Sequence, residues 1–257
     1  MKKSLLNITS MKTKFMRGNI MNTVLLMMGG SGTRFGADIP KQYIKVNDRP
    51  IFSYILEGYN KLENVDKIII VSHADWVDYV EEIAKGINAD KLYRVVTGGS
   101  TRSESVRNGL ICASEFSSDD DVILIHDATH PYVDEKGTNE VIEGVKEFGG
   151  ATLASFNYDT VYKMDDDHIL TNIEPRFNIV AGASPEAFTF RKIYDIYMNS
   201  TQEELDSMTS AGAIALHYGI KMKVVRANVI NLKITYADDM DLFIKLVDNY
   251  FFPKEDK

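Results

Sequence analysis

The chain has 257 residues, a formal net charge of −8, 44% hydrophobic residues and 26% charged residues, a composition typical of a folded globular protein. A chain of this length can bury roughly 70–75% of its unfolded surface in a core. The acidic balance disfavours nucleic acid as a partner, and the lack of any run of 18 apolar residues excludes a membrane span.

The first 21 residues differ from the rest of the sequence. They contain five basic residues and no acid, so residues 22–257 carry a net charge of −13. No continuous apolar stretch is present for a secretory signal, and a single Arg argues against a transit peptide. We expect a flexible leader, or a start codon upstream of the true start at Met21.

The only cysteine is Cys112. One cysteine cannot form an internal disulfide, which fits a reducing compartment, and we expect a cytoplasmic protein. Its place in an apolar helical pattern predicts a buried core thiol without a catalytic role.

Short β-branched segments alternate with helical patterns through most of the chain. This alternation predicts an α/β fold: a three-layer, Rossmann-like sandwich with a mainly parallel sheet covered by helices on both faces. The predicted strands are residues 23–28, 67–72, 92–97, 121–126, 150–155 and 221–225. The predicted helices between them are residues 50–62, 75–86, 102–116 and 134–148, each with apolar residues at helical spacing.

Residues 156–180 interrupt this alternation. Two short alternating segments flank Asp165-Asp166-Asp167, which predicts a protruding β-hairpin arm with a solvated turn at its tip, in preference to a metal site. Beyond the arm we expect helices near 186–199 and 203–218, a strand pair at 221–234 and a closing helix near 237–249. No boundary divides residues 22–257, so we predict a single domain.

A glycine-rich turn follows the first predicted strand, in MMGGSGTRFGADIPKQYIKV at residues 27–46. It is not a Walker A loop, because Ala37 and Asp38 follow Gly36 where that loop needs Lys and Ser or Thr. A dinucleotide fingerprint would need its third glycine one position earlier and a second strand much sooner. The remaining alternatives, about equal from this segment alone, are a triphosphate loop with Arg34 and Lys41 as cations and a plain strand-to-helix turn.

A second polar loop, HDATHPY at residues 126–132, follows another predicted parallel strand. Ligands of such sheets bind beyond the carboxyl ends of the strands. The glycine turn and this loop should therefore line one crevice.

Five segments together carry a family resemblance. LMMGGSGTRFGADIPKQY resembles the signature loop of the sugar-nucleotide pyrophosphorylase superfamily, which has a glycosyltransferase-A-like fold. The other segments are GGSTRSESVRNGL (98–110), HDATHPY, DTVYK (159–163) and NLKIT (231–235). In this order they resemble the cytidylyltransferase branch that includes the 2-C-methyl-D-erythritol 4-phosphate and D-ribitol-5-phosphate cytidylyltransferases.

The resemblance implies a nucleotide site that binds CTP. Its triphosphate would be held by the glycine loop, and Arg34, Lys41 and Lys233 would stabilise charge during attack on the α-phosphate. A lysine in an apolar strand context, as at Lys233, favours a functional role. By the same resemblance the nucleotide-binding residues are Gly29, Gly30, Ser31, Gly32, Gly98, Gly99, Arg102 and Ser105.

The resemblance also implies an acceptor site and a cofactor. Asp127 would lie near Mg²⁺ and the acceptor; as a lone carboxylate it could instead cap the next helix. Thr160 and Arg176 would reach across a two-fold axis into the partner's site, making residues 156–180 a dimerisation arm of a homodimer. His130 and Thr209 would complete the acceptor side.

Departures from the family pattern lie on the acceptor side. His130 replaces an Arg, residues 183–186 replace a Q-T-P-Q-like run, and the acids expected after Thr209 are missing. The prediction is thus a CTP-dependent enzyme that makes a CDP-polyol and pyrophosphate, with methylerythritol phosphate, ribitol phosphate or another capsular sugar or polyol phosphate as acceptor. The alternatives are a non-catalytic nucleotide-binding relative and, third, an NAD-dependent dehydrogenase.

Overall fold

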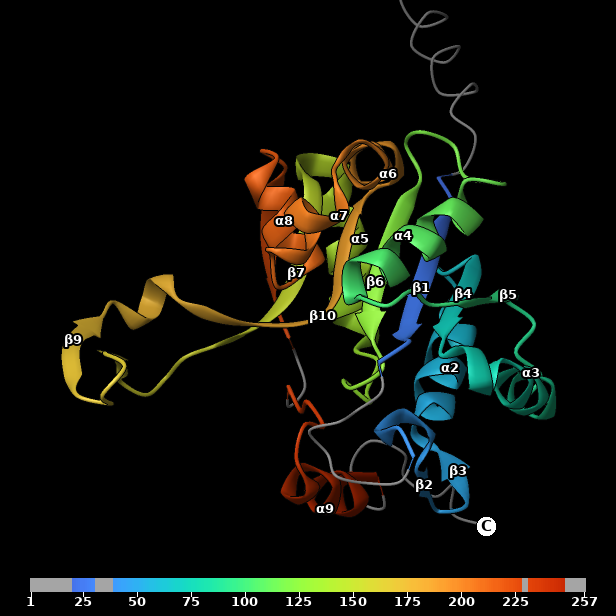
Figure 1. Cartoon of the computed structure of the whole chain (residues 1–257), viewed down its shortest axis with the longest axis horizontal. Helices are drawn as coiled ribbons and strands as arrows, with labels where there is room; N and C mark the ends of the chain where they lie inside the picture. The colour runs from blue at the N-terminus through green and yellow to red at the C-terminus, as the bar shows by residue number, and fades with distance from the viewer. Residues whose placement is uncertain (1–19, 31–38, 228–230, 248–257) are drawn as a thin grey trace, which may run out of the picture.

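A seven-stranded sheet forms the centre of the computed structural model, which describes residues 20–30, 39–227 and 231–247 (Figure 1). Its strand order is β11-β7-β10-β6-β1-β4-β5. The bounds are β1 Asn22–Met28, β4 Lys67–Ser72, β5 Leu92–Thr97, β6 Val122–Asp127, β7 Gly149–Phe156, β10 Val180–Thr189 and β11 Lys221–Arg226. All neighbouring pairs are parallel except the two made by β10, which runs antiparallel to both β6 and β7. The predicted, mainly parallel sheet is confirmed.

Helices cover both faces of the sheet. Alternate residues of β1 point to opposite faces, so Leu26 belongs to one core cluster and Leu25 to the other. The helices on the Leu26 face are α2 (Ile51–Lys61), α3 (Val77–Gly86) and α5 (Glu135–Phe148). Those on the Leu25 face are α4 (Arg102–Ala113), α6 (Phe190–Asn199), α7 (Gln202–Asp206) and α8 (Ala211–His217). The three-layer sandwich therefore follows directly from the period-two pattern of the strands.

A smaller third core lies below the carboxyl edge of the sheet (Figure 1). Helix α9 (Ala237–Leu246) packs there against the short hairpin β2 (Lys45–Val46) and β3 (Arg49–Pro50). Leu232 and Ile234 belong to the same cluster. This core joins the segment after the glycine turn to the NLKIT segment, although they are far apart in sequence.

The arm leaves the sheet between β7 and β10 and projects away from it (Figure 1). It carries the antiparallel pair β8 (Val161–Met164) and β9 (Leu170–Glu174). The Asp165 side chain accepts hydrogen bonds from the backbone N–H of Asp167 and of Ile169, at 3.1 and 2.9 Å. The predicted hairpin is confirmed, with Asp165 organising its turn.

Three predictions about the C-terminal part were wrong. Residues 186–189 end strand β10, and the predicted helix begins only at Phe190, because these residues pair with both β6 and β7. The helix expected at 203–218 is two helices, and Ser210 starts the second by accepting the N–H of Ala213 at 3.0 Å. Residues 231–235 form no strand, so the predicted pair at 221–234 consists of β11 alone within the described residues.

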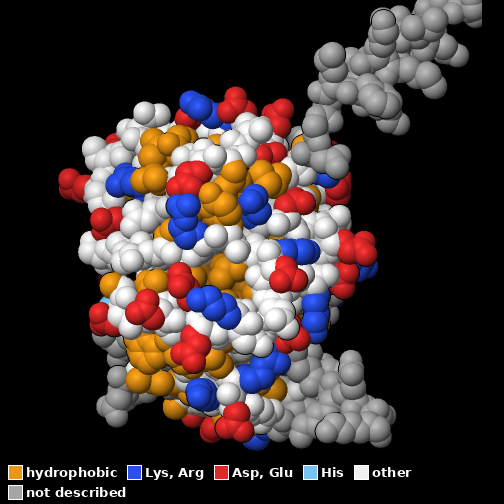
Figure 2. Space-filling view, turned by 90° about the vertical axis from the view of Figure 1, so that its right-hand side faces the viewer, with side chains coloured by type: hydrophobic (Ala, Val, Ile, Leu, Met, Phe, Trp, Pro, Cys, Tyr) orange, Lys and Arg blue, Asp and Glu red, His pale blue; other side chains and the backbone are white. Residues whose placement is uncertain are grey.

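On the face shown in Figure 2, acidic and basic side chains are interspersed without a broad basic area. In the part of the chain that the structure describes, no helix combines the length and the apolarity that a bilayer crossing requires.

Candidate active site

The site lies where the parallel strands β1, β4, β5 and β6 end. Register pairing aligns Met28 with Ser72, Ser72 with Thr97, and Met27 with Asp127. The loops that follow these strands therefore emerge at one edge, as expected for a ligand site of a parallel sheet.

Gln42 holds the start of the glycine turn. Its amide nitrogen Nε2 donates to the carbonyl of Met28 at 2.7 Å and to that of Gly30 at 2.9 Å. Gln42 is only 4% exposed, and its bond to the Met28 carbonyl is shielded from water, whereas Gly30 lies at the surface. Tyr43 supports the same strand end through Ser72, whose Oγ lies 2.9 Å from its hydroxyl. Ser31, Gly32 and Arg34 lie outside the described residues.

The glycine turn touches the loop that follows β5. A Cβ on Gly98 would lie 3.4 Å from the Cα of Gly29 and 2.9 Å from the Oγ of Ser105. Ser105 Oγ accepts the N–H of Gly99 at 3.0 Å and donates to the Thr101 carbonyl at 2.9 Å. The structure thus brings together Gly29, Gly98, Gly99 and Ser105, with glycine required where the two backbones meet.

Arg102 lies between two carboxylates. Its Nη2 is 3.0 Å from Asp127 Oδ1 and 3.9 Å from Glu186 Oε2. Burial acts to lower the pKa of Arg102, but the two nearby negative charges outweigh it and raise the pKa. Burial acts to raise the pKa of Asp127, yet Arg102 and then Lys233 hold it below its ordinary value. The pKa of Glu186 is raised, first by burial and further by Asp127.

Asp127 does not cap the following helix. That role belongs to Asp134, whose side chain accepts the N–H of Gly137 at 2.9 Å at the start of α5. The backbone N–H of Asp127 instead donates to Ser184 Oγ at 3.3 Å. The Asp127 carboxylate is therefore directed to Arg102 and to the edge of the sheet.

A buried polar chain supports the loop from Asp127 to His130. Tyr59 Oη lies 2.7 Å from His126 Nδ1, and His126 Nε2 lies 2.8 Å from the His130 carbonyl. His130 Nδ1 is 3.1 Å from Ser184 Oγ. Burial lowers the pKa of His126 to about 4 and that of His130 to about 3. Both imidazoles are therefore neutral at pH 7.

Lys41 and Lys233 are placed by the third core. Lys41 is half-buried. The pKa of the Asp239 carboxyl in α9 is lowered mainly by two backbone N–H donors, and the nearby charge of Lys41 lowers it further. Lys233 lies between the buried Leu232 and Ile234 but is itself exposed, and it acts on the pKa of Asp127. The prediction that Lys233 lies in a strand was wrong, although its charge does act on Asp127.

Thr209 lines a cavity of about 280 Å³ that borders Arg102. Ser210, the neighbouring residue, also lines it and belongs to the loop between α7 and α8. The backbone N–H of Gly212 in this region donates to Glu186 Oε1 at 3.0 Å. The α7–α8 loop is thereby tied to the carboxylate pair around Arg102.

Thr160 and Arg176 are not brought to this edge within the chain. Both are exposed on the arm, which extends away from the sheet (Figure 1). Arg176 Nη1 donates to the Tyr158 carbonyl at 2.7 Å, and its guanidinium lies 4.9 Å from the ring centre of Phe177. Neither residue reaches the carboxyl edge of the sheet in its own chain.

Sequence reasoning assigned no role to Gln42 or Tyr59, and it named Ser184 and Glu186 only within a run of departures on the acceptor side. Gln42 offered a weak signal, because it is a polar residue between Pro40 and an aromatic residue just after the glycine turn. Tyr59 contacts His126, Ser184 contacts His130, and Glu186 contacts Arg102. The two residues of each pair are at least 54 positions apart, so no local sequence pattern indicates these contacts.

The chain is similar to known cytidylyltransferases along most of its length. The family profile of 2-C-methyl-D-erythritol 4-phosphate cytidylyltransferase matches residues 22–246. An enzyme of that name from Petrotoga mobilis is 33% identical over 85% of this chain and 94% of its own length. A ribitol-5-phosphate cytidylyltransferase from Streptococcus agalactiae serotype Ia is 28% identical over 89% of this chain and 96% of its own.

Two solved structures share the fold. The 4-diphosphocytidyl-2C-methyl-D-erythritol synthase of Anaerococcus prevotii has a TM-score of 0.74 and 23% identity, covering 90% of this chain and 99% of its own. The 2-C-methyl-D-erythritol 4-phosphate cytidylyltransferase of Francisella tularensis has a TM-score of 0.70 and 27% identity, covering 87% and 98%. From the profile match and these similarities, the chain belongs to the 2-C-methyl-D-erythritol 4-phosphate cytidylyltransferase family.

Proposed function

We propose that this chain transfers CMP from CTP to a polyol phosphate, giving a CDP-polyol and pyrophosphate. The acceptor would be 2-C-methyl-D-erythritol 4-phosphate, for isoprenoid synthesis, or D-ribitol 5-phosphate, for surface-polymer synthesis. One observation carries the proposal: the glycine loops after β1 and β5 touch each other beside the Arg102–Asp127 pair at the carboxyl edge of the sheet. Membership of a cytidylyltransferase family supports a shared role of the nucleotide loop and the carboxylate in this reaction.

The reaction needs positioning and charge stabilisation, and no protein nucleophile. An oxygen of the acceptor phosphate attacks the α-phosphorus of CTP, and the bond from that phosphorus to the bridging oxygen breaks as pyrophosphate leaves. Gly29, Gly98 and Gly99 would let the backbone approach the nucleotide closely. Arg34, Lys41 and Lys233 would stabilise the negative charge that develops on the phosphates.

On the acceptor side, Asp127 would accept hydrogen bonds from acceptor hydroxyls. His130, neutral because burial lowers its pKa to about 3, cannot replace the positive charge of the family's Arg. It can only hydrogen-bond. The acceptor phosphate must then rely on Lys233 and on cations from elsewhere.

Those cations would come from the arm of a second copy. Thr160 and Arg176 would enter the partner's acceptor site in a homodimer. The arm has the surface that such contact requires, with Phe177 80% exposed and Tyr158 66% exposed. Burying these rings against a second copy would remove a large apolar area from water.

Mg²⁺ would be held by Asp127 together with substrate phosphates. Among residues 20–30, 39–227 and 231–247, no group of three His, Cys, Asp or Glu side chains is placed to bind a metal. A single carboxylate still fits Mg²⁺, which commonly binds one or two carboxylates plus phosphate oxygens and water. The ion would supply positive charge for the triphosphate.

Pyrophosphate release tests the proposal. The purified chain is incubated with CTP, Mg²⁺ and each acceptor of a panel that includes both named polyol phosphates and other sugar phosphates. We expect turnover with one acceptor far above the others. Turnover with none of them, while calorimetry still shows CTP binding, would support a non-catalytic nucleotide-binding relative, the alternative that the neutral His130 favours.

A further inference from the structure

The tautomer of His126 is fixed by its two neighbours. Its Nε2 lies 2.8 Å from the His130 carbonyl, which can only accept, so Nε2 carries the proton. Nδ1 is then unprotonated and needs a donor. Tyr59 supplies it from 2.7 Å, and because burial raises the pKa of Tyr59, the hydroxyl keeps its proton.

This imidazole closes the loop that carries Asp127. The loop leaves β6 at Asp127 and turns back so that the N–H of His130 donates to the Asp127 carbonyl at 2.9 Å. The bond from His126 to the His130 carbonyl holds the far side of the turn. Ser184 contacts both His130 Nδ1 and the N–H of Asp127.

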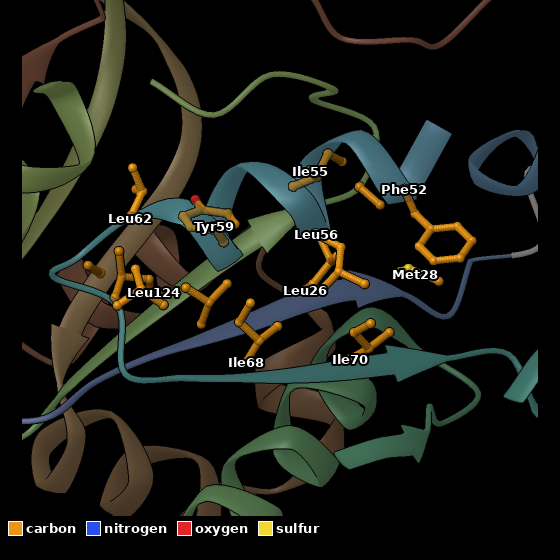
Figure 3. Packing of buried hydrophobic residues seen from close by; sticks show 14 of the residues in the cluster. Leu26, Met28, Phe52, Ile55, Leu56, Tyr59, Leu62, Ile68, Ile70 and Leu124 are labelled. Atoms are coloured by element: carbon orange, nitrogen blue, oxygen red, sulfur yellow. The ribbon is translucent and has the colours of Figure 1, made fainter. Parts of the chain in front are cut away.

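Tyr59 anchors this arrangement from another layer. It belongs to α2 and is fully buried among aliphatic side chains of the core (Figure 3). The rings of Tyr59 and His126 meet edge to face, with centroids 5.3 Å apart. Since the core fixes the ring, the hydroxyl approaches Nδ1 from a constant position.

We propose that Tyr59 is a positioning residue for acceptor binding, acting through His126 to place Asp127 and His130. This inference rests on the proposed function. Without the Tyr59 hydroxyl, the unprotonated Nδ1 of His126 is left buried without its donor. The ring would turn to find another donor, the bond from Nε2 to the His130 carbonyl would weaken, and the loop would open.

Tyr54 offers a matched control on the same helix. It is also buried, at 3% exposure, and its hydroxyl donates to the Val46 carbonyl at 2.7 Å. Val46 lies on β2 and not on the loop from Asp127 to His130. Tyr54→Phe therefore removes an equally short buried hydrogen bond without touching His126.

The kinetic test compares Tyr59→Phe with Tyr54→Phe. We expect Tyr59→Phe to raise KM for the acceptor on the order of tenfold, while KM for CTP changes less than about twofold. Tyr54→Phe should lower the midpoint of urea unfolding similarly and leave both KM values unchanged. Equal shifts of both KM values in Tyr59→Phe, or no shift of the acceptor KM, would overturn the proposal.

A spectroscopic test needs no turnover and so separates this inference from the proposed function. Long-range ¹⁵N–¹H spectra of the histidine rings should show protonated Nε2 for His126 in the wild type, and a shifted Nδ1 signal in Tyr59→Phe because that nitrogen loses its donor. Amide signals of residues 128–130 should shift in Tyr59→Phe and stay in place in Tyr54→Phe. A wild-type His126 protonated at Nδ1, or unmoved amides in Tyr59→Phe, would refute the link even if the enzyme is active.

Discussion

The two halves of the candidate site differ in the groups that form them: main-chain groups on the nucleotide side and side chains on the acceptor side. On the nucleotide side, Gln42 and Ser105 hold main-chain groups of Gly30 and Gly99, next to the close approach of Gly98 to Gly29. On the acceptor side, a buried cluster of side chains from separate elements surrounds Arg102. A site made of main-chain groups suits a ligand of constant shape, such as a nucleotide. A site made of side chains can change its ligand preference with a few substitutions. This difference fits the expectation from the sequence that departures from the family pattern lie on the acceptor side.

The largest expected effect concerns charge stabilisation, which both halves share. Lys41→Ala should reduce kcat roughly 10²–10³-fold, because the variant lacks a cation that stabilises the developing charge. Lys45→Ala, four residues further on and exposed, is the control and should keep wild-type activity. Pyrophosphate release at saturating CTP measures both, and near-normal activity of Lys41→Ala would contradict its assignment.

Next in size, Arg176→Ala should separate the two halves. Losing a charged hydrogen bond to the acceptor phosphate should raise the acceptor KM on the order of 50-fold and leave the CTP KM nearly unchanged. Lys163→Ala, another exposed cation of the arm, is the matched control. Equal losses for both substrates would mean that the arm does not serve the acceptor half.

Acid should weaken the acceptor half before the nucleotide half. His126 has a folded pKa of about 4, below the unfolded value of about 6.5, so the unfolded chain binds more protons below pH 6.5. Stability is then lost as pH falls from 6.5 towards 4, with about 2 kcal/mol gone between pH 7 and pH 5 from this group alone. Urea unfolding at several pH values measures this. His126→Asn should flatten the pH dependence, and an unchanged slope would show that His126 is not the cause.

The smallest effect tests the close backbone contact on the nucleotide side. The Cβ of Gly98→Ala would lie 2.9 Å from Ser105 Oγ and press on Gly29, so we expect CTP to bind about tenfold more weakly. Gly86→Ala has open space around the new Cβ and should leave CTP binding unchanged. Isothermal titration with CTP compares the two variants; similar affinities would mean that the glycine contact is not needed.

The layered fold could be predicted because strand and helix periods are written in local sequence. Strand β10 could not, because its residues 183–186 contain a proline and the strand exists only through pairing with β6 and β7. The sheet register in fact shifts between Gly182 and Glu186. The predicted start of the helix, near residue 186, was therefore four residues before its actual start at Phe190.

The site was predictable to the extent that its chemistry is local. Glycines 98 and 99 could be placed because only a residue without a side chain allows that contact. Glu186 could not, since its partners Arg102 and Gly212 are distant in sequence and meet only in the folded chain. For the same reason, no local pattern indicates that His130 is buried, or that burial lowers its pKa to about 3.

The arm and the acceptor site share one continuous strand. β10 returns from the arm at Val180 and reaches Ser184 and Glu186 a few residues later, where these side chains hold His130 and Arg102. A force applied to the tip of the arm is therefore carried by covalent backbone into the partners of Asp127.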